Sequence, residues 1–279
     1  MSKRKNEWTE EKIEKYIKEG RGQGELNNYK PWLMIQNVSS NGNESRPRGW
    51  KTNRKHDFLS NLERDYFFIL EWLDNIIDIR EQFPLDRELT YKIAMEKGIS
   101  HSIDSKHDTL MVMTTDFVLT VREGKEIKYI ARTVKVGAEL EDKRVIEKFE
   151  IEREYWERKG IDWGIVTEKD ISSEMANNIS WFHKSYYVEG ISDVGFIKIF
   201  LKYILSFSNE NTNLIDAFNQ FDDQYNLDNG QALVYFKHLV ARKYIFIDIL
   251  TNKINLRRLK IRNISFRIGG DESYDYAIG

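Results

Sequence analysis

Asp116 is the residue whose surroundings point most directly to chemistry. It lies in the segment 109–121, which is otherwise built mainly from Leu, Met, Val, Thr and Phe. An ionised carboxylate in such a strand is costly unless a cation or hydrogen-bond donors compensate it. Thr133 and Lys135 are two residues apart on the next predicted strand, so the pleat places both side chains on one face, where they can converge with Asp116.

The pattern of an aspartate followed on the next strand by Thr133-Val134-Lys135 resembles the D…(D/E)-x-K pattern of restriction-endonuclease-like nucleases. Carboxylates of that pattern hold a divalent cation such as Mg²⁺ or Mn²⁺, which polarises the phosphoryl oxygen and lowers the pKa of water. The lysine adds positive charge where negative charge builds up in the transition state. Thr133 stands where the pattern usually has an acid, so an active site requires a carboxylate from elsewhere.

Glu63, on the preceding predicted helix, is the first candidate for that carboxylate, and Glu152, on the following helix, is the second. Each has a purely structural alternative. Glu63 follows Ser60 by three residues, as in a capping box. Glu152 is compatible with a solvated helix face, and Asp116 with a buried ion pair to a neighbouring Arg or Lys.

The elements that must position these residues form an α/β pattern. Apolar spacing predicts a helix over 58–75 with Ser60 as N-cap, strands over 109–121 and 127–136 joined by a turn at 122–126, a helix over 142–159 and a strand over 163–167. This order favours a mixed sheet in a first domain, residues 1–170. Residues 171–279 differ: helices over 213–225 and 231–242 followed by a hairpin within 244–256 match the outline of a winged helix.

Composition narrows the class of protein. The 279 residues include 43 Lys and Arg against 45 Asp and Glu, and no Cys, which excludes disulfides, thiolate metal sites and thiol nucleophiles. No apolar segment follows the basic residues of the first twenty, so a secretory signal is not expected. The longest apolar stretch, 194–207, is interrupted by Lys198 and Lys202, so we expect no membrane span and a cytoplasmic protein.

Several longer blocks resemble the TnsA family, the endonuclease subunits of heteromeric transposases of target-selecting bacterial transposons. The blocks are EGRGQG (19–24), PWLMIQNV (31–38), LSNLERDYFFILEW (59–72), DIREQFPL (78–85), TTDFV (114–118) and EKFEIEREYW (147–156). They occur in this order, and the resemblance extends over residues 13–181.

The resemblance implies a restriction-endonuclease-like catalytic domain with a mixed sheet core and a C-terminal winged-helix-like α+β domain for interactions. It implies Mg²⁺- or Mn²⁺-dependent cutting of the 5′-end strands of the transposon. A DDE transposase, TnsB, would cut and join the 3′ ends, and an AAA+ ATPase, TnsC, would activate the pair. The match assigns Glu63, Asp116 and Lys135 to catalysis, and Glu63, Asp116 and Glu152 to the metal. Transposon-end DNA is the expected substrate, which implies a bacterial protein associated with the nucleoid when active.

Two basic stretches are candidates for further contacts. A loop before the Glu63 helix is predicted to bind DNA phosphates, or else to be a solvated loop, and carries Arg46, Arg48, Lys51, Arg54 and Lys55. Residues 249–270 hold six cations and no acid, a composition suited to DNA or to an acidic partner.

Two alternatives to the transposase nuclease remain open. One is a non-catalytic DNA-binding or assembly adaptor that keeps the nuclease fold, which Thr133 and the near-neutral charge allow. The other is a free-standing nuclease, against which the same lack of overall basicity argues.

Overall fold

The computed structural model describes residues 7–37, 45–187, 195–207 and 211–267. The chain divides into two compact units, residues 1–171 and 172–279. Within the described ranges, no helix has the length and apolar character needed to cross a membrane.

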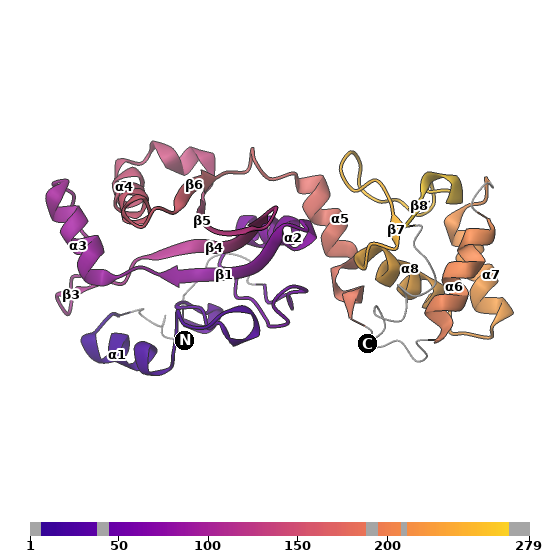
Figure 1. Ribbon diagram of the computed structural model, residues 1–279, viewed down its shortest axis with the longest axis horizontal. Coiled ribbons are helices and arrows are strands. Elements are labelled where there is room, and N and C mark those ends of the chain that lie inside the picture. The colour runs from indigo at the N-terminus through magenta and orange to yellow at the C-terminus, as the bar shows by residue number, and fades with distance from the viewer. Residues whose placement is uncertain (1–6, 38–44, 188–194, 208–210, 268–279) are drawn as a thin grey trace. The chain divides into compact units, whose positions relative to one another are not determined.

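A four-stranded mixed sheet organises the first unit (Figure 1); the sequence pattern predicted a mixed sheet with three of these strands. Its strand order is β1-β4-β5-β6, with β1, β4 and β5 antiparallel and β6 parallel to β5. The main elements of this unit are α1 (Glu10–Lys18), α2 (Asn61–Trp72), β1 (Ile76–Pro84), α3 (Arg87–Glu96), β4 (Thr114–Glu123), β5 (Glu126–Val134), α4 (Lys143–Arg158) and β6 (Asp162–Val166). Short elements complete it: 3-10 turns at Leu26–Asn28, Ile35–Asn37 and Gly137–Glu141, and the pair β2 (Ile103–Asp104) and β3 (Thr109–Leu110).

Local sequence explains where these elements begin and turn. The Ser60 side chain accepts a hydrogen bond from the Glu63 backbone N–H and starts α2, and Asp142 caps α4 in the same way. Gly124, at φ 62°, lies in the two-residue turn between β4 and β5, where a left-handed backbone is needed. The strand predicted over 109–121 is interrupted: β3 ends at Leu110 and β4 begins at Thr114.

Two apolar layers fix the sheet. Val118 of β4 and Ala131 of β5 join one buried cluster with Ile93 of α3 and Ile151 of α4. Phe117 of β4 instead contacts aromatic rings that include Phe58 before α2 and Tyr66 within α2. Packing on the sheet therefore holds α2 and α4 in place, and both helices supply residues to the candidate active site.

The second unit is mainly helical. Its elements are α5 (Ser173–His183), a 3-10 turn at Lys184–Tyr186, α6 (Gly195–Ser206), α7 (Leu214–Gln224), α8 (Gln231–Ala241), β7 (Ile245–Phe246), a 3-10 turn at Ile261–Asn263 and β8 (Ser265–Phe266). Aromatic side chains form its core: Phe200 of α6, Phe221 of α7 and Tyr235 of α8 are fully buried and in ring contact.

The predicted hairpin within 244–256 is wrong. Strand β7 pairs with β8, at 265–266, and the intervening chain is largely irregular. The reason is a buried side chain, Asn178 of α5, whose amide donates to the backbone carbonyls of Ile249 and Asn252 and accepts from the Ile254 N–H. These bonds take the backbone groups that a hairpin would have paired.

Candidate active site

One hollow of about 430 Å³ in the first unit is lined by all four residues expected to act in catalysis or metal binding. Glu63 comes from α2, Asp116 from β4 and Glu152 from α4, while Lys135 directly follows β5. Other residues also line the hollow, among them Thr133, Lys148, Met111, Val112 and Met113.

Asp116 lies on β4, next to the last residue that pairs with β5. The pairing of β4 with β5 ends at Phe117 and Arg132, and beyond it the Asp116 carboxylate itself accepts the backbone N–H of Val134 at 2.8 Å. On its other side Asp116 accepts the side-chain amide of Gln82 at 3.2 Å. Two donors thus hold this carboxylate at the end of the strand ladder.

Glu63 approaches Asp116 through the same glutamine. Gln82 Nε2 lies 3.5 Å from Glu63 Oε2, and the backbone N–H of Leu59 donates to the same oxygen at 3.2 Å. The Ser60 cap is present, so the capping interpretation is correct for the backbone of Glu63. Its carboxylate nevertheless lies at the hollow and is 7% exposed as a residue.

Glu152 is held by hydroxyls rather than by cations. The hydroxyls of Thr115, at 2.6 Å, and Thr133 both donate to Glu152 Oε1, and the Trp163 indole N–H donates at 3.1 Å. Glu152 is buried, so the solvated helix face considered for it is wrong. Through Thr133, a helix carboxylate reaches the strand position where the nuclease pattern usually has its own acid.

Burial raises the proton affinity of all three acids. Loss of solvent and the nearby charge of Asp116 raise the pKa of Glu63 to about 8. Burial raises the pKa of Asp116 to about 6, although Val134, Gln82 and the Lys135 charge act in the opposite direction. Burial raises the pKa of Glu152 to about 7 against its hydroxyl donors. Each acid therefore carries a cost for its negative charge that a bound cation would relieve.

Two lysines supply positive charge to the hollow. Lys135 Nζ lies 2.6 Å from Glu139 Oε2, so its ammonium is paired with an acid outside the hollow's lining. Lys148, on α4, also lines the hollow, and among the described residues it has no hydrogen bond or ion pair. Partial desolvation, followed by the charges of Arg144 and Lys135, lowers the pKa of Lys148.

The acids do not form a finished metal cage. Within the described ranges, no three His, Asp or Glu side chains are grouped closely enough to hold a metal ion. The donor set still fits a hard cation, because Glu63 and Asp116 present carboxylate oxygens to one hollow and the charge of Asp116 disfavours the charged form of Glu63.

The basic loop before α2 is partly used inside the protein. Arg54 is 8% exposed in its side chain and forms an ion pair with the fully buried Glu81 at 2.5 Å. Arg46 pairs with Asp57 at 2.9 Å, and Arg48 donates to Asn53 at 2.7 Å.

Lys51 donates to the Leu73 carbonyl at 2.8 Å. Lys55 is exposed and has no bonded side-chain partner among the described residues. The five cations of the loop are therefore not equivalent, and Arg54 faces the protein rather than solvent.

Gln82 and Lys148 are the site residues that sequence reasoning missed. Gln82 has a left-handed backbone at φ 48°, is 2% exposed, and also accepts from the Thr114 hydroxyl at 3.3 Å. The available signal was a run of three polar residues, Arg80-Glu81-Gln82, between the apolar Ile79 and Phe83. Lys148 could have been found because it precedes Glu152 by four residues, on one face of a helix.

Comparison with known proteins identifies the family of the chain. Residues 73–168 match the family model described as TnsA-like endonuclease N terminal, and residues 170–249 match TnsA endonuclease C terminal. The transposon Tn7 transposition protein TnsA of Escherichia coli is 38% identical over 250 residues, which cover 89% of this chain and 90% of that protein. With both halves matched and a relative aligned along nearly its whole length, the chain belongs to the TnsA endonuclease family.

Proposed function

We propose that this TnsA-family endonuclease uses Mg²⁺ or Mn²⁺ to hydrolyse the 5′-end strands of a transposon during cut-and-paste excision. Its partners would be transposon-end DNA, a DDE transposase of the TnsB type that cuts and joins the 3′ ends, and an AAA+ regulator of the TnsC type. The observation that carries the chemical part is the pair of acids, Glu63 and Asp116, bridged by Gln82 in a hollow with two lysines.

The proposed role of each residue follows from the chemistry of its side chain. Glu63 and Asp116 would hold the cation, with Glu152 as the adjoining acid reached through Thr133. When bound, the cation supplies the positive charge that polarises the phosphoryl oxygen and lowers the pKa of water. Gln82 keeps Asp116 oriented by its amide hydrogen bond.

The lysines act on the substrate in this proposal. Lys148, whose ammonium is not engaged by a described acid, contacts the scissile phosphate and stabilises its developing charge. Lys135 contributes once a phosphate competes with Glu139 for its ammonium. Of the loop before α2, the exposed Arg46 and Lys55, with Arg48 and Lys51, contact flanking phosphates, whereas Arg54 serves the fold.

Strand-specific cleavage tests the proposal. Supercoiled DNA with cognate transposon ends is incubated with the partner transposase and ATPase in Mg²⁺ or Mn²⁺, and 5′ and 3′ cuts are mapped separately. We expect Asp116→Ala to abolish the 5′-strand cuts while 3′ cutting and joining continue. Asp223→Asn, an exposed acid on α7, is the control and should cut as the unmodified protein does.

The same assay decides between the nuclease and the adaptor. Unchanged 5′ cutting by Asp116→Ala would move the chemistry to another protein and leave this chain as an assembly factor. Cutting by the isolated chain on any DNA would instead support a free-standing nuclease.

A further inference from the structure

Most of a positively charged surface of the second unit follows residue 249, where the second family-model match ends. We call residues 249–267 the basic strap; it connects β7 to β8 and includes β8. Its sequence contains no acid and six cations: Lys253, Arg257, Arg258, Lys260, Arg262 and Arg267. All but Lys260 are exposed.

None of these six cations forms a salt bridge with a carboxylate of the described residues. Lys260 has a neutral partner, the Asn211 side-chain oxygen at 2.8 Å. The contrast with α4 in the first unit is sharp, because Arg153 pairs there with both Glu150 and Glu157. The strap cations, unlike Arg153, therefore lack a carboxylate partner among the described residues.

Hydrogen bonds hold the backbone of the strap in place, although little of it is helix or strand. Buried Asn178 of α5 binds the backbone of its first part through three hydrogen bonds. Asn213, the N-cap of α7, donates to the Arg257 carbonyl at 2.7 Å, and the Leu214 N–H donates to the Leu259 carbonyl at 3.1 Å. A backbone held in this way presents its cations at set positions and lowers the entropy lost on binding.

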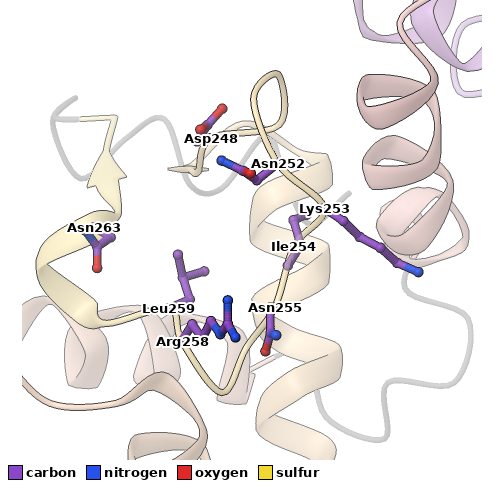
Figure 2. A pocket seen from close by; sticks show the side chains of 8 residues that line it. All are labelled: Asp248, Asn252, Lys253, Ile254, Asn255, Arg258, Leu259 and Asn263. Atoms are coloured by element: carbon purple, nitrogen blue, oxygen red, sulfur yellow. The ribbon is translucent and has the colours of Figure 1, made fainter.

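A hollow of about 630 Å³ opens between parts of the strap and the turn before it. Figure 2 shows Arg258 and Asn255 on one stretch of its lining and Asp248 on the opposite rim. The Thr251 hydroxyl and the backbone N–H groups of Leu250 and Thr251 bind the Asp248 carboxylate and lower its pKa. The rim acid is thus engaged by its own turn rather than by a strap cation.

We propose that the basic strap binds the phosphate backbone of DNA, independently of the catalytic hollow. Phosphate takes Lys and Arg cations together with side-chain amide donors, and the strap exposes both kinds of residue, such as Lys253, Arg257 and Asn255. A protein partner would call for an apolar anchor at the centre of the patch, whereas Ile261 and Ile264 of the strap are buried in the unit's own core and the exposed Leu250 precedes all six cations in sequence. The choice of DNA rests on the proposed function, in which the chain acts on DNA.

The test measures binding of the full-length chain to a short fluorescent DNA duplex by anisotropy, over a range of KCl concentrations in EDTA. The variant Arg257→Gln/Arg258→Gln removes two exposed strap cations. We expect it to bind at least about tenfold more weakly on every sequence and to reduce the slope of log K against log salt by about 2. Arg257→Lys/Arg258→Lys should restore most of both quantities.

Matched controls separate the strap from general charge and from catalysis. Lys184→Gln/Lys202→Gln removes two exposed cations elsewhere in the same unit and should leave the slope unchanged. The anisotropy is measured in EDTA and reports binding alone, so a failure of the nuclease proposal, which the cleavage assay of Asp116→Ala reports, does not remove the strap's effect. An unchanged melting temperature of each variant excludes loss of folding as the cause.

Wild-type DNA binding by Arg257→Gln/Arg258→Gln would overturn the proposal. Retained DNA binding together with weaker binding of poly-glutamate would assign the strap to an acidic protein surface instead.

Discussion

Gln82 and Asp116 occupy opposing positions on β1 and β4, and the Gln82 amide donates to the Asp116 carboxylate at 3.2 Å. Regular pairing is recorded for the residues on either side, Glu81 with Phe117 and Phe83 with Thr115. Gln82 itself has a left-handed backbone, a conformation that costs energy for a residue with a side chain. This backbone conformation places the Gln82 side-chain amide within hydrogen-bond distance of both Glu63 and Asp116.

Replacing Gln82 by Met should therefore impair the site more than the fold. Met keeps the approximate volume but removes the donor that orients Asp116 and Glu63. We expect 5′-strand cleavage to fall about 10- to 100-fold and the Mg²⁺ concentration for half-maximal rate to rise. The measurement is cleavage rate against Mg²⁺ concentration, with the exposed Gln36→Met as control. A wild-type metal requirement in Gln82→Met would show that the amide does not tune the acids.

Lys148→Gln tests the second lysine of the hollow. Loss of a charge-assisted contact to the developing phosphate charge should lower cleavage by about tenfold or more, mainly through a lower kcat. Binding of Mn²⁺ should remain, because Lys148 is not among the proposed ligands. Lys143→Gln is the control on the same helix, since Lys143 is 91% exposed in its side chain and lies outside the hollow. Equal activities of the two variants would assign Lys148 to the solvated surface.

The pH dependence of stability tests the burial of the three acids. The folded pKa values of Glu63 and Glu152, about 8 and 7, lie above the ordinary 4.5. Between those values the folded chain binds more protons than the unfolded chain, so the free energy of unfolding falls as pH rises. Each group contributes up to about 1.4 kcal/mol per pH unit inside its window.

Urea unfolding in EDTA at several pH values between 5.5 and 8 measures this slope. Glu152→Gln should flatten part of it, and Mn²⁺ added in place of EDTA should oppose the loss at the upper end by competing with protons for the acids. A slope equal in the original protein and in Glu152→Gln would mean that Glu152 ionises as it does in the unfolded chain.

The sequence predicted the parts of the fold that local pattern determines. β4, β5 and α4 have strong apolar periodicity, and Ser60 and Asp142 are residues with a strong preference for the N-cap. β1 was missed because Asp78, Arg80 and Glu81 interrupt its apolar pattern, and these charges are satisfied only in the folded chain, as in the ion pair of Arg80 with Asp78. The hairpin was misplaced because its competitor, Asn178, lies some seventy residues away in sequence.

The sequence predicted four residues that line the candidate site, but not the hydrogen bonds and ion pairs that hold the residues around it. Glu63, Asp116, Lys135 and Glu152 line one hollow, and their roles stay predictions. Gln82 could not be selected because its position beside Asp116 depends on strand register and an unusual backbone angle. Arg54 was grouped with its basic neighbours because nothing local shows that Glu81, 27 residues later, draws its side chain inward.

Arg54 and Lys55 are adjacent cations for which the structure predicts opposite phenotypes. Burial alone would raise the pKa of Glu81, but the His56 and Arg54 charges and their hydrogen bonds outweigh it and hold that pKa well below its usual range. Arg54→Gln leaves the fully buried Glu81 with one strong partner fewer, so we expect a loss of about 3–5 kcal/mol in the free energy of unfolding. Lys55→Gln should leave stability within about 0.5 kcal/mol, because Lys55 is exposed, and should weaken DNA binding instead. Urea unfolding and DNA anisotropy on both variants separate the two roles. A stable Arg54→Gln protein that has lost DNA binding would return Arg54 to the DNA-contacting loop and contradict the structural role assigned to it here.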